Sequence, residues 1–123
     1  GYLYVVAYDE LAGQTVTGPN KEPSLPTPRL VFKDHIGGSI STPVIVGDSI
    51  VAAGYDNTVH LYSIAYPQGA DGFKTRDGRS VDVSIKETAS FKGGAAFEST
   101  PLIWDGRVYI GCRDGFLYCL GDR

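Results

Sequence analysis

Short runs of β-branched and aromatic residues alternate with clusters of glycine, aspartate, asparagine and proline along the whole chain. No run has the 3.6-residue spacing of apolar positions that is typical of an amphipathic helix, so we expect an all-β sandwich, barrel or propeller. The segments 8–28 and 65–81 break the rhythm with proline, glycine and charged residues, and we expect them to be exposed loop insertions. The pattern predicts nine strands, at residues 2–7, 29–34, 41–46, 49–54, 58–64, 82–91, 99–104, 107–112 and 115–120.

One part of this pattern is written twice. Residues 41–62, which begin Ser-Thr-Pro, return without a gap from residue 99 onward, at a spacing of 58 residues. A third, partial copy opens the chain, because residues 1–6 match residues 115–120. A unit that recurs at such a period usually buries its apolar faces against copies of itself. The repetition therefore predicts sheets of one kind that pack on one another about an axis.

The connections between the repeated strands have the chemistry of tight hairpins. Pro43 and Pro101 lie early in the first strand of each copy, which predicts an edge strand there because proline offers no N–H to a neighbouring strand. The turns that follow carry dipeptides that tolerate a positive φ, namely Gly47-Asp48, Asp56-Asn57, Asp105-Gly106 and Asp114-Gly115.

Composition narrows the possible partners. With 123 residues and 42% hydrophobic content, the chain can bury one core, and its net charge of −3 gives no basic field for nucleic acid. No apolar run approaches the length of a membrane span, so we expect no membrane insertion. Cys112 and Cys119 would lie about 10 Å apart on neighbouring strands, too far for a disulfide. We expect both to be small buried hydrophobes.

The repeated residues resemble a known family. Ser-Thr-Pro with an apolar strand, an Asp-Gly turn, the strand 108–111 and then Arg-Asp-Gly-Phe-Leu-Tyr-Cys-Leu at 113–120 is similar to the repeat of PQQ-like β-propellers. That superfamily includes the quinoprotein alcohol dehydrogenases and the outer-membrane assembly propeller lipoprotein. The resemblance implies four-stranded antiparallel blades, with residues 1–40 ending one blade, 41–91 forming a full blade and 92–123 supplying the inner strands of the next.

About two blades do not close a ring, because propellers use typically four to eight. We therefore expect a partial propeller that belongs to a longer protein or assembles from several copies. Where the family has a tryptophan on the outer strand, this chain has Phe32 and Phe91, and its one tryptophan is Trp104 on an inner strand. Members that hold the quinone carry adjacent cysteines, whereas Cys112 and Cys119 are not adjacent. We expect no cofactor.

One end of the array gathers polar residues. The parity of the strands places the second-to-third turns there together with the connections between blades, which carry His35, Lys92 and Glu98. We predict a ligand-binding surface formed by Tyr55, Asp56, Arg113 and Asp114. The simpler interpretation of the two aspartates is that their carboxylates cap their own hairpins. Tyr55 and Arg113 share one repeat position and are least explained by turn chemistry.

We predict no catalytic residue and no metal site. Ser41 and Ser99 are repeat equivalents, which indicates structural hydroxyls rather than nucleophiles. His60 matches Tyr118 and Tyr4 in the repeat, so we expect it to be a half-buried packing residue. His35 and His60 have no third ligand at metal spacing.

Three functions remain open at this point. The first is a non-catalytic scaffold or a ligand- or protein-binding surface within a larger secreted or periplasmic protein, a location that the resemblance implies. The second is a fragment of a PQQ-dependent quinoprotein dehydrogenase, whose catalytic residues would lie outside this chain. The third is a carbohydrate-binding, lectin-like propeller. The expected partners are other propeller blades, from the same parent chain or from further copies, and a protein or a carbohydrate. Fold alone does not choose among these functions.

Overall fold

The computed structural model describes residues 1–22, 25–74 and 78–121, and this part of the chain is all-β, as predicted. Its strands form four separate sheets, and none of them closes on itself. The described residues contain no helix that could cross a membrane. The chain divides into two compact units, residues 4–34 and residues 1–3 together with 35–123.

Residues 4–34 carry most of a two-stranded sheet, made of β1 (Tyr2–Val16) and β2 (Leu25–His35). The prediction of a loop at 8–28 is therefore wrong, because both strands extend into that segment. Proline can occur in β2 because each strand of a two-stranded sheet is an edge strand. On its outer side an edge strand needs no N–H for pairing with a neighbour. The connection between the strands includes a turn in which Lys21 N–H donates to Gly18 C=O at 2.9 Å. Residues 23–24 of the predicted insertion lie outside the described part.

The second unit contains a four-stranded antiparallel sheet with the order β3-β4-β5-β8. Its strands are β3 (Val44–Val46), β4 (Ser49–Ala53), β5 (Thr58–Ala65) and β8 (Ser84–Lys92). Between β5 and β8 the chain forms a small separate sheet from β6 (Gln68–Lys74) and β7 (Ser80–Val81). The prediction of a loop at 65–81 is therefore also wrong, although residues 75–77 lie outside the described part.

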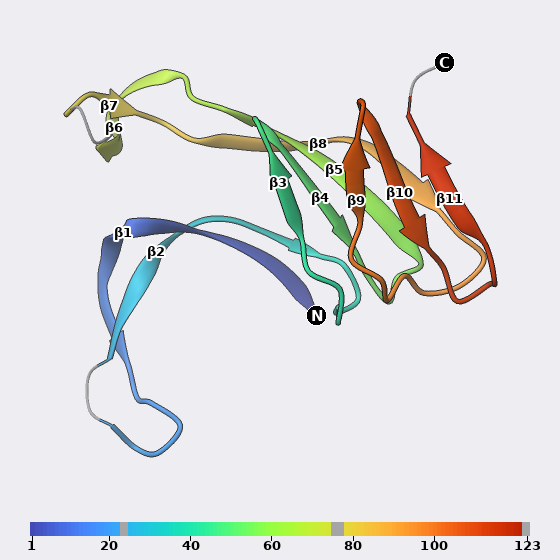
Figure 1. Cartoon of the computed structure of the whole chain (residues 1–123). Coiled ribbons are helices and arrows are strands. Elements are labelled where there is room, and N and C mark those ends of the chain that lie inside the picture. Colours follow the sequence, from blue (N-terminus) through green and yellow to red (C-terminus); the bar gives the residue numbers. More distant parts are fainter. Residues whose placement is uncertain (23–24, 75–77, 122–123) are drawn as a thin grey trace. The chain divides into compact units, whose positions relative to one another are not determined.

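A three-stranded antiparallel sheet follows, with the order β9-β10-β11. Its strands are β9 (Leu102–Trp104), β10 (Arg107–Gly111) and β11 (Leu117–Leu120). Figure 1 shows this sheet, in red and dark orange, beside the four-stranded sheet, in which β3, β4 and β5 are green to yellow-green and β8 is light orange. Both β3 and β9 are shorter than predicted and begin just after Pro43 and Pro101, where the missing N–H cannot join a ladder.

The two sheets repeat each other in hydrogen bonding as well as in sequence. Gly54 N–H donates to Thr58 C=O at 3.2 Å, and 58 residues later Cys112 N–H donates to Phe116 C=O at 2.9 Å. Ser41 Oγ donates to Ala53 C=O at 3.2 Å, and its equivalent Ser99 Oγ donates to Gly111 C=O at 3.0 Å. The turns have the expected positive φ values at Asn57 (66°), Asp105 (48°) and Gly115 (92°).

The core of this unit lies between the two sheets. Val51, Ala53 and Val59 from the four-stranded sheet are buried in one cluster with Ile110 of β10 and with Phe97, which belongs to the connection from β8 to β9. The rings of Phe91 on β8 and Tyr118 on β11 also meet, with centroids 4.9 Å apart. The other face of β4 is covered as well, because Ile50 and Ala52 are buried.

Candidate functional site

Two of the predicted site residues meet at one carboxylate. Tyr55, in the turn after β4, donates its hydroxyl to Oε1 of Glu98 at 3.0 Å. Arg113, in the turn after β10, donates from Nη1 to the same oxygen at 3.2 Å. Glu98 lies in the connection between β8 and β9. We call these three residues the turn cluster, and it joins the repeat-equivalent turns of the two sheets.

The turn cluster is polar and open to solvent. The side chain of Arg113 is 64% exposed. Of the five N–H donors of its guanidinium, one is bonded to Glu98. The hydrogen bond to Glu98 stabilises the neutral phenol and so raises the pKa of Tyr55 above its usual range. An exposed aromatic ring beside a guanidinium and a carboxylate can bind a polar ligand through stacking and hydrogen bonds.

Asp56 and Asp114, the other two predicted site residues, do not join this cluster. Oδ1 of Asp56 accepts from Thr58 N–H at 3.0 Å, and Oδ1 of Asp114 accepts from Phe116 N–H at 3.1 Å. Each carboxylate therefore caps its own hairpin. Oδ2 of Asp114 also accepts the Tyr118 hydroxyl, and this bond lowers the pKa of Asp114 while it raises that of Tyr118.

His60 forms a bridge between two acidic residues. Its Nε2 lies 2.8 Å from Oδ2 of Asp56, and its Nδ1 lies 2.8 Å from Oε1 of Glu87 on β8. A neutral imidazole has only one N–H, so both contacts are hydrogen bonds only when the ring is protonated. Burial of the ring opposes its charge, but the bonds to Glu87 and Asp56 outweigh burial and raise the pKa of His60. His60 thus does more than the packing that its repeat position predicts.

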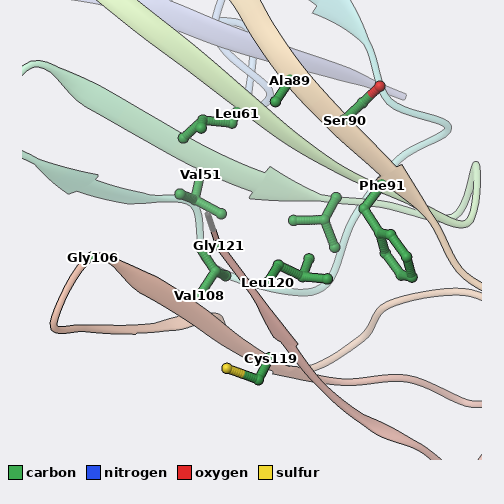
Figure 2. Close-up of a pocket in the computed structure, with 11 residues that line it drawn as sticks. Val51, Leu61, Ala89, Ser90, Phe91, Gly106, Val108, Cys119, Leu120 and Gly121 are labelled. Carbon is green, nitrogen blue, oxygen red and sulfur yellow. The ribbon is translucent and has the colours of Figure 1, made fainter. Parts of the chain in front are cut away.

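A cleft of about 430 Å³ lies between the two sheets. In Figure 2 the side chains of Val51 and Leu61 from the four-stranded sheet face Leu120 of β11 across this space, whereas the sulfur of Cys119 points away from it. Ala89, Ser90 and Phe91 of β8 line one side of the cleft. Sequence reasoning missed this cleft, since it depends on how far two sheets separate.

The remaining sequence predictions have mixed outcomes. Ser41 and Ser99 are structural hydroxyls, because each bonds the backbone of the neighbouring strand. Cys112 and Cys119 are both free, as predicted, but the prediction that both are buried is wrong, because Cys112 is half-buried and Cys119 is exposed. Cys119 lies on the face of β11 that is directed away from the four-stranded sheet. Among the described residues, no group of three His, Cys, Asp or Glu side chains is arranged to hold a metal ion.

Glu87 and Glu98 were not among the predicted site residues. Glu87 reaches His60 because a bulge between Leu61 and Tyr62 shifts the pairing of β5 with β8. Strand alternation alone does not reveal such a bulge. Glu98 carries a detectable signal, since it directly precedes the repeated Ser-Thr-Pro and so lies on the same end of the array as the turns.

Compared with known proteins, the chain matches no protein-family model and no curated protein sequence.

Proposed function

We propose that this chain is a non-catalytic segment of a PQQ-like β-propeller, which acts as a scaffold and as a ligand- or protein-binding surface within a larger secreted or periplasmic protein. Its two central sheets would be consecutive blades. The strand order supports this proposal, because the chain passes through each sheet in sequence and then crosses from the outer strand β8 to the first strand of the next sheet, β9. Radial repeat folds have this connectivity.

The observation that carries the proposal is a difference in exposure between two equivalent residues. Val59 on β5 is 4% exposed and packs toward the three-stranded sheet, whereas Leu117 on β11, its repeat equivalent, is 75% exposed. Tyr109 and Cys119 of the second sheet are the repeat equivalents of Val51 and Leu61 in the first sheet. The uncovered face of the second sheet therefore corresponds to a face that is covered in the first. A further sheet of the same kind would complete the series.

The turn cluster supports a binding role at one end of this array. It combines Tyr55 and Arg113 from equivalent turns, so its geometry depends on the stacking of the two sheets. A surface built in this way forms only when neighbouring blades pack correctly. The expected ligand is a protein or a carbohydrate with polar groups that complement the phenol and the guanidinium.

An extended chain tests the proposal directly. Repeating residues 63–121 after Leu120 continues the 58-residue phase and would add a complete outer strand and one more sheet. The parent chain and the extended chain are compared, each with Cys112→Ala, and the cysteines of the added part are changed to alanine. Cys119 is then the one thiol in each protein, and its alkylation rate reports whether its face of the sheet is covered. We expect alkylation to slow by about tenfold or more, because thiol reactivity follows accessibility. Equal rates in two folded proteins would show that the added sheet does not stack.

A further inference from the structure

We propose that the turn cluster binds a neutral glycan, with the ring of Tyr55 stacked on one sugar ring and with Glu98 and Arg113 bonded to a pair of neighbouring hydroxyls. The inference rests on the proposed function, because it accepts the binding role of the turn cluster and names the class of ligand. The turns that carry Tyr55 and Arg113 lie at the same end of the two sheets (Figure 1).

The backbone holds the turn cluster in place before any ligand arrives. Arg113 N–H donates to Ala96 C=O at 3.1 Å, and Phe97 N–H donates to Gly54 C=O at 3.3 Å. The connection that carries Glu98 is therefore tied to the turn after β10 and to the turn after β4. Phe97 is also fully buried, so this connection is anchored in the core. A site that is ordered in advance loses little conformational entropy on binding, which favours a small ligand with few contacts.

The ring of Tyr55 is the apolar part of the site, and Tyr55 is 42% exposed. Beside the ring lies Gly38, whose C=O accepts Tyr55 N–H at 2.9 Å. A Cβ at residue 38 would lie 4.0 Å from Cδ2 of the ring, and the φ of 89° favours glycine there. This side of the ring therefore stays uncovered by residue 38. The negative face of an aromatic ring attracts C–H groups, such as those on the apolar face of a sugar.

The polar part of the site offers both acceptors and donors of hydrogen bonds. The two bonds that Glu98 accepts in the turn cluster use Oε1, and no described residue donates to its other oxygen, Oε2. Arg113 keeps further N–H donors beyond the one that Glu98 accepts. A sugar hydroxyl both donates and accepts, so two neighbouring hydroxyls can donate to Oε2 and accept from the guanidinium at the same time.

The charges of the site favour a neutral ligand. Glu98 and Arg113 form an ion pair at 3.2 Å, so their charges largely cancel. The carboxylates of Asp56 and Asp114 lie in the same two turns and oppose an anionic ligand, whereas the guanidinium opposes a cationic one. A protein partner is less favoured, because the cores of protein interfaces are depleted of carboxylates such as that of Glu98.

Neutral oligosaccharides test the inference on the chain as it stands. The probes are maltohexaose, cellohexaose and mannohexaose, and binding is followed by saturation-transfer difference NMR and by the side-chain N–H signal of Arg113. We expect saturable binding of at least one probe, with little dependence on salt because the ligand carries no charge. Hexagalacturonate is the anionic comparison and should bind more weakly than the best neutral probe.

Variants of the turn cluster separate this site from unspecific binding of sugars. Tyr55→Ala removes the ring and Arg113→Ala removes the donors, and each should weaken binding by about tenfold or more. Arg113→Lys keeps the charge but not the planar guanidinium, so it should recover little of the binding. The matched controls are Tyr66→Ala and Arg107→Ala, at an exposed tyrosine and an exposed arginine outside the cluster, and they should bind as the parent chain does. Circular dichroism checks that all variants keep their β structure.

Absence of saturable binding of every neutral probe, equal binding by Tyr55→Ala, or tighter binding of hexagalacturonate would each overturn the glycan site. A capped peptide of alternating serine and tyrosine tests for a protein ligand, and its Tyr55-dependent binding without any glycan binding would also overturn it. If no glycan binds while Glu98→Gln still shifts the pKa of Tyr55, the turn cluster exists and only the class of ligand is wrong. If Cys119 stays reactive in the extended chain, the proposed function fails whatever the glycan result.

Discussion

The backbone N–H of Thr42 donates a hydrogen bond of 3.2 Å to Oγ1 of Thr100, which is the same residue of the repeat 58 positions later. Equivalent residues of two stacked sheets touch only where the sheets converge. The contact therefore marks the side on which β3 and β9 approach each other. The turn cluster links the same two sheets through the turns that follow β4 and β10.

Thr100→Val should destabilise the chain by about 0.5–1 kcal/mol, because it removes the acceptor of this exposed hydrogen bond and keeps the shape of the side chain. Urea unfolding measures the change. Thr42→Val is the matched control, since Thr42 contributes its backbone N–H and not its hydroxyl to the bond. Equal losses in the two variants would contradict the role of this contact.

Phe97→Ala should cost about 3–5 kcal/mol in the free energy of unfolding, as is usual for deletion of a fully buried aromatic ring. Phe97 is 0% exposed and packs between the two sheets. Phe116→Ala, at an exposed aromatic residue of the same unit, should cost far less. Thermal unfolding followed by circular dichroism compares them, and similar midpoints would argue against a core between the sheets.

Stability should fall as the pH rises through the raised pKa of His60. The protonated ring bridges Asp56 and Glu87, so its contribution is complete below the usual histidine pKa of about 6.5 and is lost above the folded value. Urea unfolding between pH 6 and pH 9 measures this loss. In His60→Tyr, which copies the repeat equivalent Tyr118, the loss should be much smaller. The other histidine, His35, is present in both the parent chain and His60→Tyr. If the free energy of unfolding depends on pH equally in the two proteins, His60 is not the cause.

Glu98→Gln should lower the pKa of Tyr55. The carboxylate of Glu98 accepts a hydrogen bond from the neutral phenol and its negative charge repels the phenolate, and the substitution removes that charge. Absorbance titration of the phenolate, with Tyr55→Phe subtracted to isolate one tyrosine among eight, gives the value. Arg113→Gln should shift the pKa of Tyr55 the other way, since the guanidinium favours the phenolate. No difference between Glu98→Gln and the parent chain would mean that the turn cluster does not form in solution.

Much of the fold was predictable because its determinants are local. Apolar alternation located the strands of both central sheets, and the Asp-Asn and Asp-Gly dipeptides located hairpins at Asn57 and Gly115. The segments 8–28 and 65–81 were predicted as loops because proline and polar residues interrupt the first and glycine, aspartate and arginine interrupt the second. Yet β1 and β2 extend into the first segment, and β6 and β7 lie in the second. Proline excludes a central strand but not an edge strand, and composition alone does not distinguish the two.

The amino-acid sequence by itself determined the strands, the turns and the 58-residue phase, since these follow from side-chain alternation and from backbone preferences of neighbouring residues. It also indicated that Tyr55 and Arg113 occupy one repeat position. Only the tertiary structure decided that both reach Glu98, and that a bulge in β5 brings His60 to Glu87. Such contacts join residues 15 to 43 positions apart, and their geometry depends on strand register and sheet stacking rather than on any local pattern.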